Sequence, residues 1–140
     1  MNTKNNKIFD FWNDHSLVFL EMAMKRDYQE SITSCDGYGK KTRECGDTIE
    51  FYLMIKEDII QSVSYNIKGC LFSHACANTL IKLTRLQSVE RARTIGPWDI
   101  TTCLKTLPKE EEHCAVHALA AFHLALDDYE THKGLTCCKS

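Results

Sequence analysis

The chain has 140 residues, of which 44% are hydrophobic and 26% are charged, and its formal net charge is -2 at pH 7. This length and composition fit one soluble globular domain, predicted over residues 1–140, that buries its core without disulfide bonds. The small negative charge gives no electrostatic basis for binding nucleic acid or an anionic membrane, so neither is expected as a partner. No signal-peptide pattern and no run of about 18 apolar residues is present, so a cytoplasmic protein is expected.

Two β-rich runs in the middle of the chain predict an antiparallel hairpin. Apolar residues alternate over residues 48–55 and again over 59–67, and three polar residues separate the runs. Before them, residues 8–25 carry apolar residues at helical spacing and predict an N-terminal helix. Residues 31–44 are polar and glycine-containing, which indicates a loop or a short edge strand.

The second half of the chain is predicted to be helical. Ser73 is the expected cap of a helix that follows the hairpin, and Ser88 begins a shorter one. Asp99 is the expected cap of a helix over residues 100–106. The last helix is predicted from about residue 110 to 133, because small and apolar residues from Ala115 to Tyr129 recur on one stripe.

This order of elements predicts an α+β fold. We expect a small three-stranded antiparallel sheet with helices packed on one face and a long C-terminal helix. Cys45 comes before the first strand of the hairpin and Cys70 follows the second. Antiparallel pairing brings the start of one strand beside the end of the next. Cys45 and Cys70 are therefore predicted to lie at the same end of the sheet.

Eight cysteines are many for a chain of this length. In a reducing compartment they are not expected to form a disulfide framework, so some are ligands, reactive thiols or buried apolar residues. Cys76 and Cys103 lie in helical patterns and are interpreted as packing, and Cys35 as a turn residue. Cys137 and Cys138 lie in a polar tail and are given no role.

Three other cysteines have settings suited to chemistry, in Cys45-Gly46-Asp47, Gly69-Cys70 and His113-Cys114. Thiolates are soft ligands for zinc and for iron-sulfur clusters, and glycine beside a cysteine lets a guest approach the sulfur closely. The thiolate of a cysteine just before a helix is also stabilised by the unpaired amides of the first turn.

Asp47 and two histidines are the remaining candidate ligands. In an extended segment the side chains of Cys45 and Asp47 point the same way, and His117 lies three residues after Cys114 on the predicted helix. His113 is adjacent to Cys114. The cysteines form no C-x-x-C pair, so spacing alone leaves a metal site and scattered structural cysteines equally open.

Taken together, the three cysteine settings resemble the NifU-like (IscU-type) family of iron-sulfur cluster scaffold proteins. That family shows Cys-Gly-Asp before a β-hairpin, Gly-Cys before a helix rich in small residues, and His-Cys opening a long C-terminal helix. The order and the surroundings of these motifs agree here. The resemblance runs from about residue 10 to residue 132.

The resemblance implies a site and a function. Cys45, Cys70 and Cys114 would be the cluster-binding thiols, Asp47 the carboxylate that keeps the cluster labile, and His113 the neighbouring histidine at the metal. Cys114 would accept persulfide sulfur from a cysteine desulfurase. Iron and electron donors would complete a [2Fe-2S] cluster, which then passes to recipient apo-proteins. Such a protein is a carrier and not an enzyme.

One departure concerns a chaperone motif. The family segment Leu-Pro-Pro-Val-Lys reads Leu107-Pro108-Lys109-Glu110-Glu111 in this chain. Recognition by a dedicated DnaK-type chaperone is therefore not predicted.

Zinc is the alternative metal at this site. The related SufU-type proteins hold zinc at the matching residues, accept sulfur from a desulfurase and carry an insertion between the second and third cysteines. Residues 71–113 of this chain show no evident insertion, which favours the scaffold. Three thiolates with a carboxylate or histidine also suit tetrahedral zinc, so a zinc-bound sulfur acceptor and a purely structural zinc module remain open.

Overall fold

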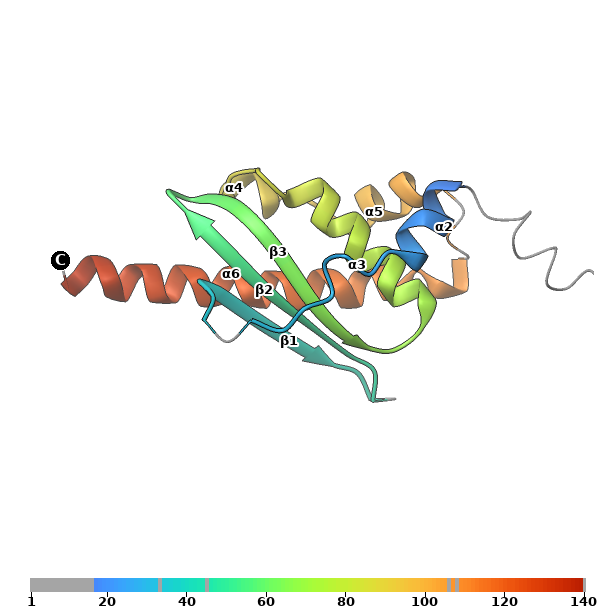
Figure 1. The fold of residues 1–140 in the computed structure, drawn as a ribbon, viewed down its shortest axis with the longest axis horizontal. Coiled ribbons are helices and arrows are strands. Elements are labelled where there is room, and N and C mark those ends of the chain that lie inside the picture. The colour runs from blue at the N-terminus through green and yellow to red at the C-terminus, as the bar shows by residue number, and fades with distance from the viewer. Residues whose placement is uncertain (1–16, 33, 45, 106, 108, 140) are drawn as a thin grey trace, which may run out of the picture.

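The computed structural model describes residues 17–32, 34–44, 46–105, 107 and 109–139. A three-stranded antiparallel sheet lies against the long helix α6, His113–Lys139, and further helices pack beside it (Figure 1). The α+β fold class, the three-stranded sheet and the long C-terminal helix are therefore confirmed. That residues 1–140 form one domain stays a prediction.

The sheet has the order β1-β2-β3, with β1 at Gly37–Thr42, β2 at Thr48–Lys56 and β3 at Ile59–Lys68. The predicted hairpin is β2 and β3. Its turn residues Glu57 and Asp58 have φ of 54° and 64°, the left-handed pair that matches the twist of a two-residue hairpin loop. Of the two alternatives for residues 31–44, the edge strand is the one that forms.

The edge strand β1 lies directly on α6, and two glycines make this possible. A Cβ atom on Gly37 would lie 2.5 Å from the carbonyl oxygen of Ala125. A Cβ atom on Gly39 would overlap the backbone of Ala121 and Ala125. Glycine is a poor strand former, so its presence here reflects the close approach of the helix.

The remaining helical elements are α2 at Leu17–Met24, α3 at Leu71–Thr84, α4 at Val89–Ala92, α5 at Pro97–Leu104 and the 3-10 turn η2 at Lys109–Glu111. The predicted N-terminal helix thus holds over α2, and its first part, residues 8–16, lies outside the described residues. The final helix begins at His113 and not near residue 110, because η2 precedes it.

The two predicted helix caps, Ser73 and Asp99, are wrong, and the predicted start of a short helix at Ser88 is confirmed. The hydroxyl of Ser88 accepts a hydrogen bond from the Arg91 amide at 3.1 Å, as a cap does. Helix α5 starts earlier than predicted, after Gly96, and the Asp99 carboxylate accepts from the Gly96 amide at 2.8 Å. Helix α3 likewise starts at Leu71, so that Ser73 is buried within its first turn.

The core lies between the sheet and the helices α3 and α6. Phe51 of β2 meets Phe122 of α6 edge to face, with ring centroids 5.6 Å apart. The predicted inward stripe of α6 is buried from Ala115 to Leu126, and Cys76 of α3 is buried as predicted. Burying one large apolar side chain contributes about 1.5–3 kcal/mol, so this layer fixes α3 and α6 against the strands.

Pairing at one end of the sheet brings together the segments that carry the candidate ligands. Thr48, at the start of β2, pairs with Lys68, at the end of β3. The turn before β2 and the start of α3 therefore lie at the same end (Figure 1). Among the described helices, none has the length and apolar character needed to cross a membrane.

Candidate metal centre

Cys70 stands between the end of β3 and the start of α3. It occupies the N-cap position of the helix, and its carbonyl oxygen accepts from the amides of Ser73 and His74 at 3.1 and 3.3 Å. Its thiol is exposed. The Cys70 sulfur is thus held at a helix N-terminus, where a metal ion or cluster can reach it from solvent.

Cys114, in the first turn of α6, lies close to Cys70 and is only 1% exposed. The buried hydroxyl of Ser73 joins the two thiols, at 3.7 Å from the Cys70 sulfur and 3.9 Å from the Cys114 sulfur. Ser73 is therefore not the cap of α3 but a polar bridge between two candidate ligands.

Glu111 adds a carboxylate that sequence reasoning did not select. Its Oε1 atom lies 3.7 Å from the Cys114 sulfur, which donates to it. One ligand atom each from Cys70, Glu111 and Cys114 lies within 4.8 Å of the others, a grouping that can hold a metal ion. His113 is exposed, and its Nε2 atom lies 3.8 Å from the same Glu111 oxygen.

Burial shapes the chemistry of Cys114. Loss of solvent, and then the neighbouring Cys70 and Glu111, raise the pKa of the Cys114 thiol to about 12, although the Ser73 hydroxyl acts to lower it. At neutral pH this thiol therefore keeps its proton until a cation arrives. Metal binding at Cys114 must release that proton, because the thiolate is the ligand.

Asp47 approaches the same place from the turn between β1 and β2. A Cβ atom added to Gly69 would lie 3.6 Å from the Asp47 carboxyl carbon, so this carboxyl group sits against the residue before Cys70. The turn is closed by hydrogen bonds from the Arg43 amide to the Asp47 carbonyl at 2.8 Å and from the Gly46 amide to the Arg43 carbonyl at 2.9 Å. Cys45, the remaining predicted ligand, lies outside the described residues.

His117 is directed toward the sheet. Its Nε2 atom lies 2.9 Å from the carbonyl oxygen of Lys41 in β1, and burial lowers the pKa of its imidazole. Its buried Nδ1 atom has no hydrogen-bond partner among the described residues. His117 thus ties α6 to the strand that leads into the Asp47 turn, and it stands apart from the Cys70, Glu111 and Cys114 grouping.

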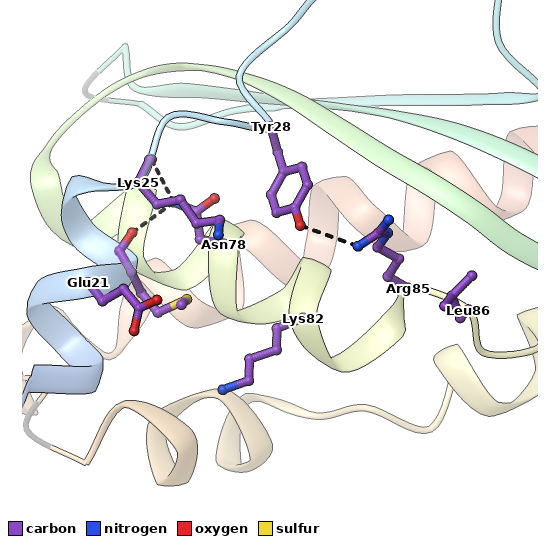
Figure 2. A pocket seen from close by; sticks show the side chains of 8 residues that line it. Glu21, Lys25, Tyr28, Asn78, Lys82, Arg85 and Leu86 are labelled. Carbon is purple, nitrogen blue, oxygen red and sulfur yellow. Dashed lines mark hydrogen bonds between the residues drawn. The ribbon is translucent and has the colours of Figure 1, made fainter.

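A cavity of about 370 Å³ lies elsewhere, between α2 and α3 (Figure 2). Its lining includes Tyr28, Asn78 and Arg85, and the Arg85 guanidinium donates to the Tyr28 hydroxyl at 3.5 Å. Lys82 extends away from Arg85 (Figure 2), whereas the Lys25 and Arg85 cations lie 5.2 and 6.0 Å from the centroid of the Tyr28 ring. None of the described residues that line this cavity is a cysteine, so the candidate metal centre is a separate place.

The model of the NifU-like N terminal domain family matches residues 26–136. The chain belongs to this family. The resemblance predicted from the three cysteine settings is therefore confirmed at the level of the family. The match spans the elements from β1 to most of α6, and with them the residues of the candidate metal centre.

The curated relatives that match this chain share 27% identity with it. Two iron-sulfur cluster assembly scaffold proteins of Archaeoglobus fulgidus, IscU 1 and IscU 2, are each 27% identical over 99 residues. The match covers 70% of this chain and 65% of each relative, so the chain spans just under two thirds of their length. The mitochondrial iron sulfur cluster assembly protein 1 of Kluyveromyces lactis is 27% identical over 97 residues, which are 68% of this chain and 53% of that protein.

Solved structures share the fold at low identity. A putative scaffold protein for the SUF system from Fervidobacterium islandicum AW-1 superposes with a TM-score of 0.66 at 16% identity, covering 81% of this chain and 97% of that one. The N-terminal part of a nitrogen-fixing NifU-like protein from Brucella abortus gives a TM-score of 0.64 at 14% identity, covering 89% and 97%. Both support the fold described above.

Proposed function

We propose that the chain is a scaffold on which a [2Fe-2S] cluster is assembled and from which it passes to apo-proteins. The observation that carries this proposal is the meeting of the Cys70 and Cys114 sulfurs around the Ser73 hydroxyl, in a chain of the NifU-like family. The cluster is cargo, and its proposed ligands are Cys45, Asp47, Cys70 and Cys114.

The ligand types suit a cluster that must leave again. Thiolates bind iron strongly, whereas a carboxylate such as Asp47 is a poorer partner for an iron-sulfur cluster. Gly69 places no side chain between Asp47 and Cys70, which leaves room for the cargo. His113, exposed beside Cys114, is proposed as a further metal-contacting group during assembly.

Cys114 is the proposed acceptor of sulfur from a cysteine desulfurase. Its thiolate would attack the terminal sulfur of the desulfurase persulfide, forming a new S–S bond while the desulfurase cysteine leaves as a thiolate. No net oxidation occurs in this step. Because burial keeps Cys114 protonated at neutral pH, the transfer needs a metal ion or a base at this sulfur first.

Other proposed partners follow from the same role. Iron and electron donors would supply the cluster, and recipient apo-proteins would remove it. The proposed compartment is the cytoplasm, where the eight cysteines stay reduced.

Anaerobic reconstitution with iron, cysteine and a desulfurase tests the scaffold. We expect about two irons and two acid-labile sulfides per site, with a visible absorption band. The content should be lost in Cys45→Ser, Cys70→Ser and Cys114→Ser and kept in the matched control Cys103→Ser. Asp47→Ala should lengthen the lifetime of the cluster. A wild-type protein that gains no sulfide would remove the proposal.

A zinc-bound sulfur acceptor is the second candidate. The observation that favours it is the Cys70, Glu111 and Cys114 grouping, whose size suits one tetrahedral ion. Its mark would be one zinc held through reconstitution, together with stoichiometric stimulation of a desulfurase that disappears in Cys114→Ser. Absence of stimulation by the intact zinc form would exclude it.

A further inference from the structure

Glu111 occupies a place where the chain departs from its family resemblance. It is the last residue of the segment Leu107 to Glu111, which ends in lysine in the family motif Leu-Pro-Pro-Val-Lys. The 3-10 turn η2 ends at Glu111, and α6 begins two residues later. This turn carries the Glu111 carboxylate back over the first turn of α6, to the sulfur of Cys114.

We propose that Glu111 is a metal ligand, so that Cys70, Glu111 and Cys114 form a binding set for one divalent cation such as zinc or iron(II). This inference rests on the proposed function, whose ligands it extends. It assigns to the α6 side of the site a carboxylate of its own, in addition to Asp47 on the β1–β2 turn.

The distances support ligation by this set. With Zn–S of about 2.3 Å and Zn–O of about 2.1 Å, ligand atoms at tetrahedral angles stand about 3.6 Å apart. The Glu111 oxygen and the Cys114 sulfur lie 3.7 Å apart, and the Cys70 sulfur is within 4.8 Å of both. The carboxylate and the Cys114 sulfur are therefore already at the spacing that one shared ion requires.

The surroundings suit a ligating carboxylate. The side chain of Glu111 is 28% exposed, so it is partly shielded and still reachable. The imidazole of His113, 3.8 Å from the same oxygen, is placed as an outer group that orients the carboxylate. A lysine at position 111 would instead bring a positive charge beside two thiols, and it would repel a cation.

The carboxylates of Asp47 and Glu111 lie on different structural elements of the site. Asp47 belongs to the turn between β1 and β2, whereas Glu111 ends η2, Cys70 caps α3 and Cys114 lies in the first turn of α6. A cation held by the second group does not depend on the position of the turn. We therefore expect Glu111→Gln to weaken the binding of a single zinc ion more than Asp47→Ala does.

The test is a zinc titration of the full chain against a chromophoric chelator, with thermal unfolding of the metal-free form measured in parallel. We expect Glu111→Gln and Glu111→Lys to weaken zinc binding by at least about tenfold, the minimum seen when even an outer-shell partner of a metal ligand is removed. Glu112→Gln is the matched control, because it removes the same charge from an exposed neighbour. The metal-free variants should unfold at the wild-type temperature.

Three results would overturn the assignment or its basis. Zinc binding by Glu111→Gln equal to wild type would show that the carboxylate only accepts the Cys114 proton. Equal weakening in Glu111→Gln and Glu112→Gln would reduce the effect to net charge. A wild-type chain that takes up neither zinc nor a cluster would remove the proposed function itself, an outcome distinct from the first two.

Discussion

The two ends of the sheet are built differently. At the hairpin end, the Tyr129 hydroxyl donates to Asp58 at 2.5 Å and Arg93 bonds Asp127 and Glu130 at 2.9 Å each. At the thiol end the side-chain contacts of Cys70 and Cys114 run through sulfur at 3.7 to 3.9 Å.

Sulfur is a weak donor and a weak acceptor, so contacts of this length stabilise the fold little. Strand β2 joins the two ends, from Thr48 near the thiols to Lys56 near the hairpin turn (Figure 1). The hairpin end satisfies its polar groups internally. The thiol end leaves the exposed Cys70 thiol accessible to a metal ion or cluster, as the proposed function requires.

Removing a thiol should break the functional end without breaking the fold. We expect Cys114→Ser to abolish cluster and zinc binding, because a neutral hydroxyl is a poor ligand for either. The serine fits the same space beside Ser73, so the melting temperature of the metal-free protein should fall by only a few degrees. Metal analysis and circular dichroism measure the two effects. Unfolding of Cys114→Ser at room temperature would contradict this separation.

A substitution in strand β1, between the two ends of the sheet, should mainly lower stability. We expect Gly39→Ala to lower the free energy of unfolding by about 3 kcal/mol, because the new methyl group would overlap the backbone of α6, which cannot rotate away. Urea unfolding measures this. Lys40→Ala, on the exposed side of the same strand, should change stability by less than about 0.5 kcal/mol. Equal effects would show that β1 does not depend on its contact with α6.

Acid should weaken the fold through His74, which is buried in α3 with its Nδ1 atom 3.3 Å from the Tyr65 hydroxyl. Burial and then Arg26 lower the pKa of His74 from 6.5 to about 4. Between these pH values the unfolded chain binds a proton that the folded chain refuses, so stability falls as pH drops from about 6.5 to 4. The loss amounts to at most roughly 3 kcal/mol.

The comparison of wild type with His74→Leu isolates this effect. Urea unfolding between pH 7 and pH 4.5 should give a shallower decline for the variant. His117 and His123 also have lowered pKa values, and they contribute equally to both proteins. Parallel declines in the two proteins would exclude His74 as the group responsible.

The smallest effect is expected from a substitution that disturbs only the hairpin end of the sheet. Tyr129→Phe removes the hydroxyl group that donates a hydrogen bond to Asp58, and we expect the free energy of unfolding to fall by about 1–2 kcal/mol. Cluster content after reconstitution should equal that of the wild type. A variant that lost cluster in proportion to stability would show that the two ends are coupled.

Hydrophobic periodicity predicts the elements that bury one face. The alternation in β2 and β3 and the apolar stripe of α6 can be recognised from neighbouring residues alone. Sequence alone does not decide between loop and strand for β1, because Gly37 and Gly39 have low strand propensity. These glycines are explained by the close approach of α6, which is far along the chain. The predicted caps at Ser73 and Asp99 are wrong because both helices begin three residues earlier than predicted, after Cys70 and Gly96.

In the candidate site, too, some residues can be predicted from the sequence and one cannot. The settings of Cys70, Cys114 and Asp47 could be selected from neighbouring residues and the resemblance. Glu111 could not, because its contact depends on the turn of η2. Two signals were available in the sequence: the three-residue spacing to Cys114, which suits one helical face, and the exchange of a family lysine for an acid.

Helix α6 begins at the thiols and passes the hairpin end as one unbroken element, His113–Lys139. At 1.5 Å per residue, about 22 Å of it separate Cys114 from Tyr129. Its middle is packed against β1, where a Cβ atom on Gly37 or Gly39 would meet the helix backbone, so the helix is held against the sheet there. An opening at Cys114 that leaves this contact intact would be a local unwinding of the first turn, and amide hydrogen exchange near Cys114 would register it.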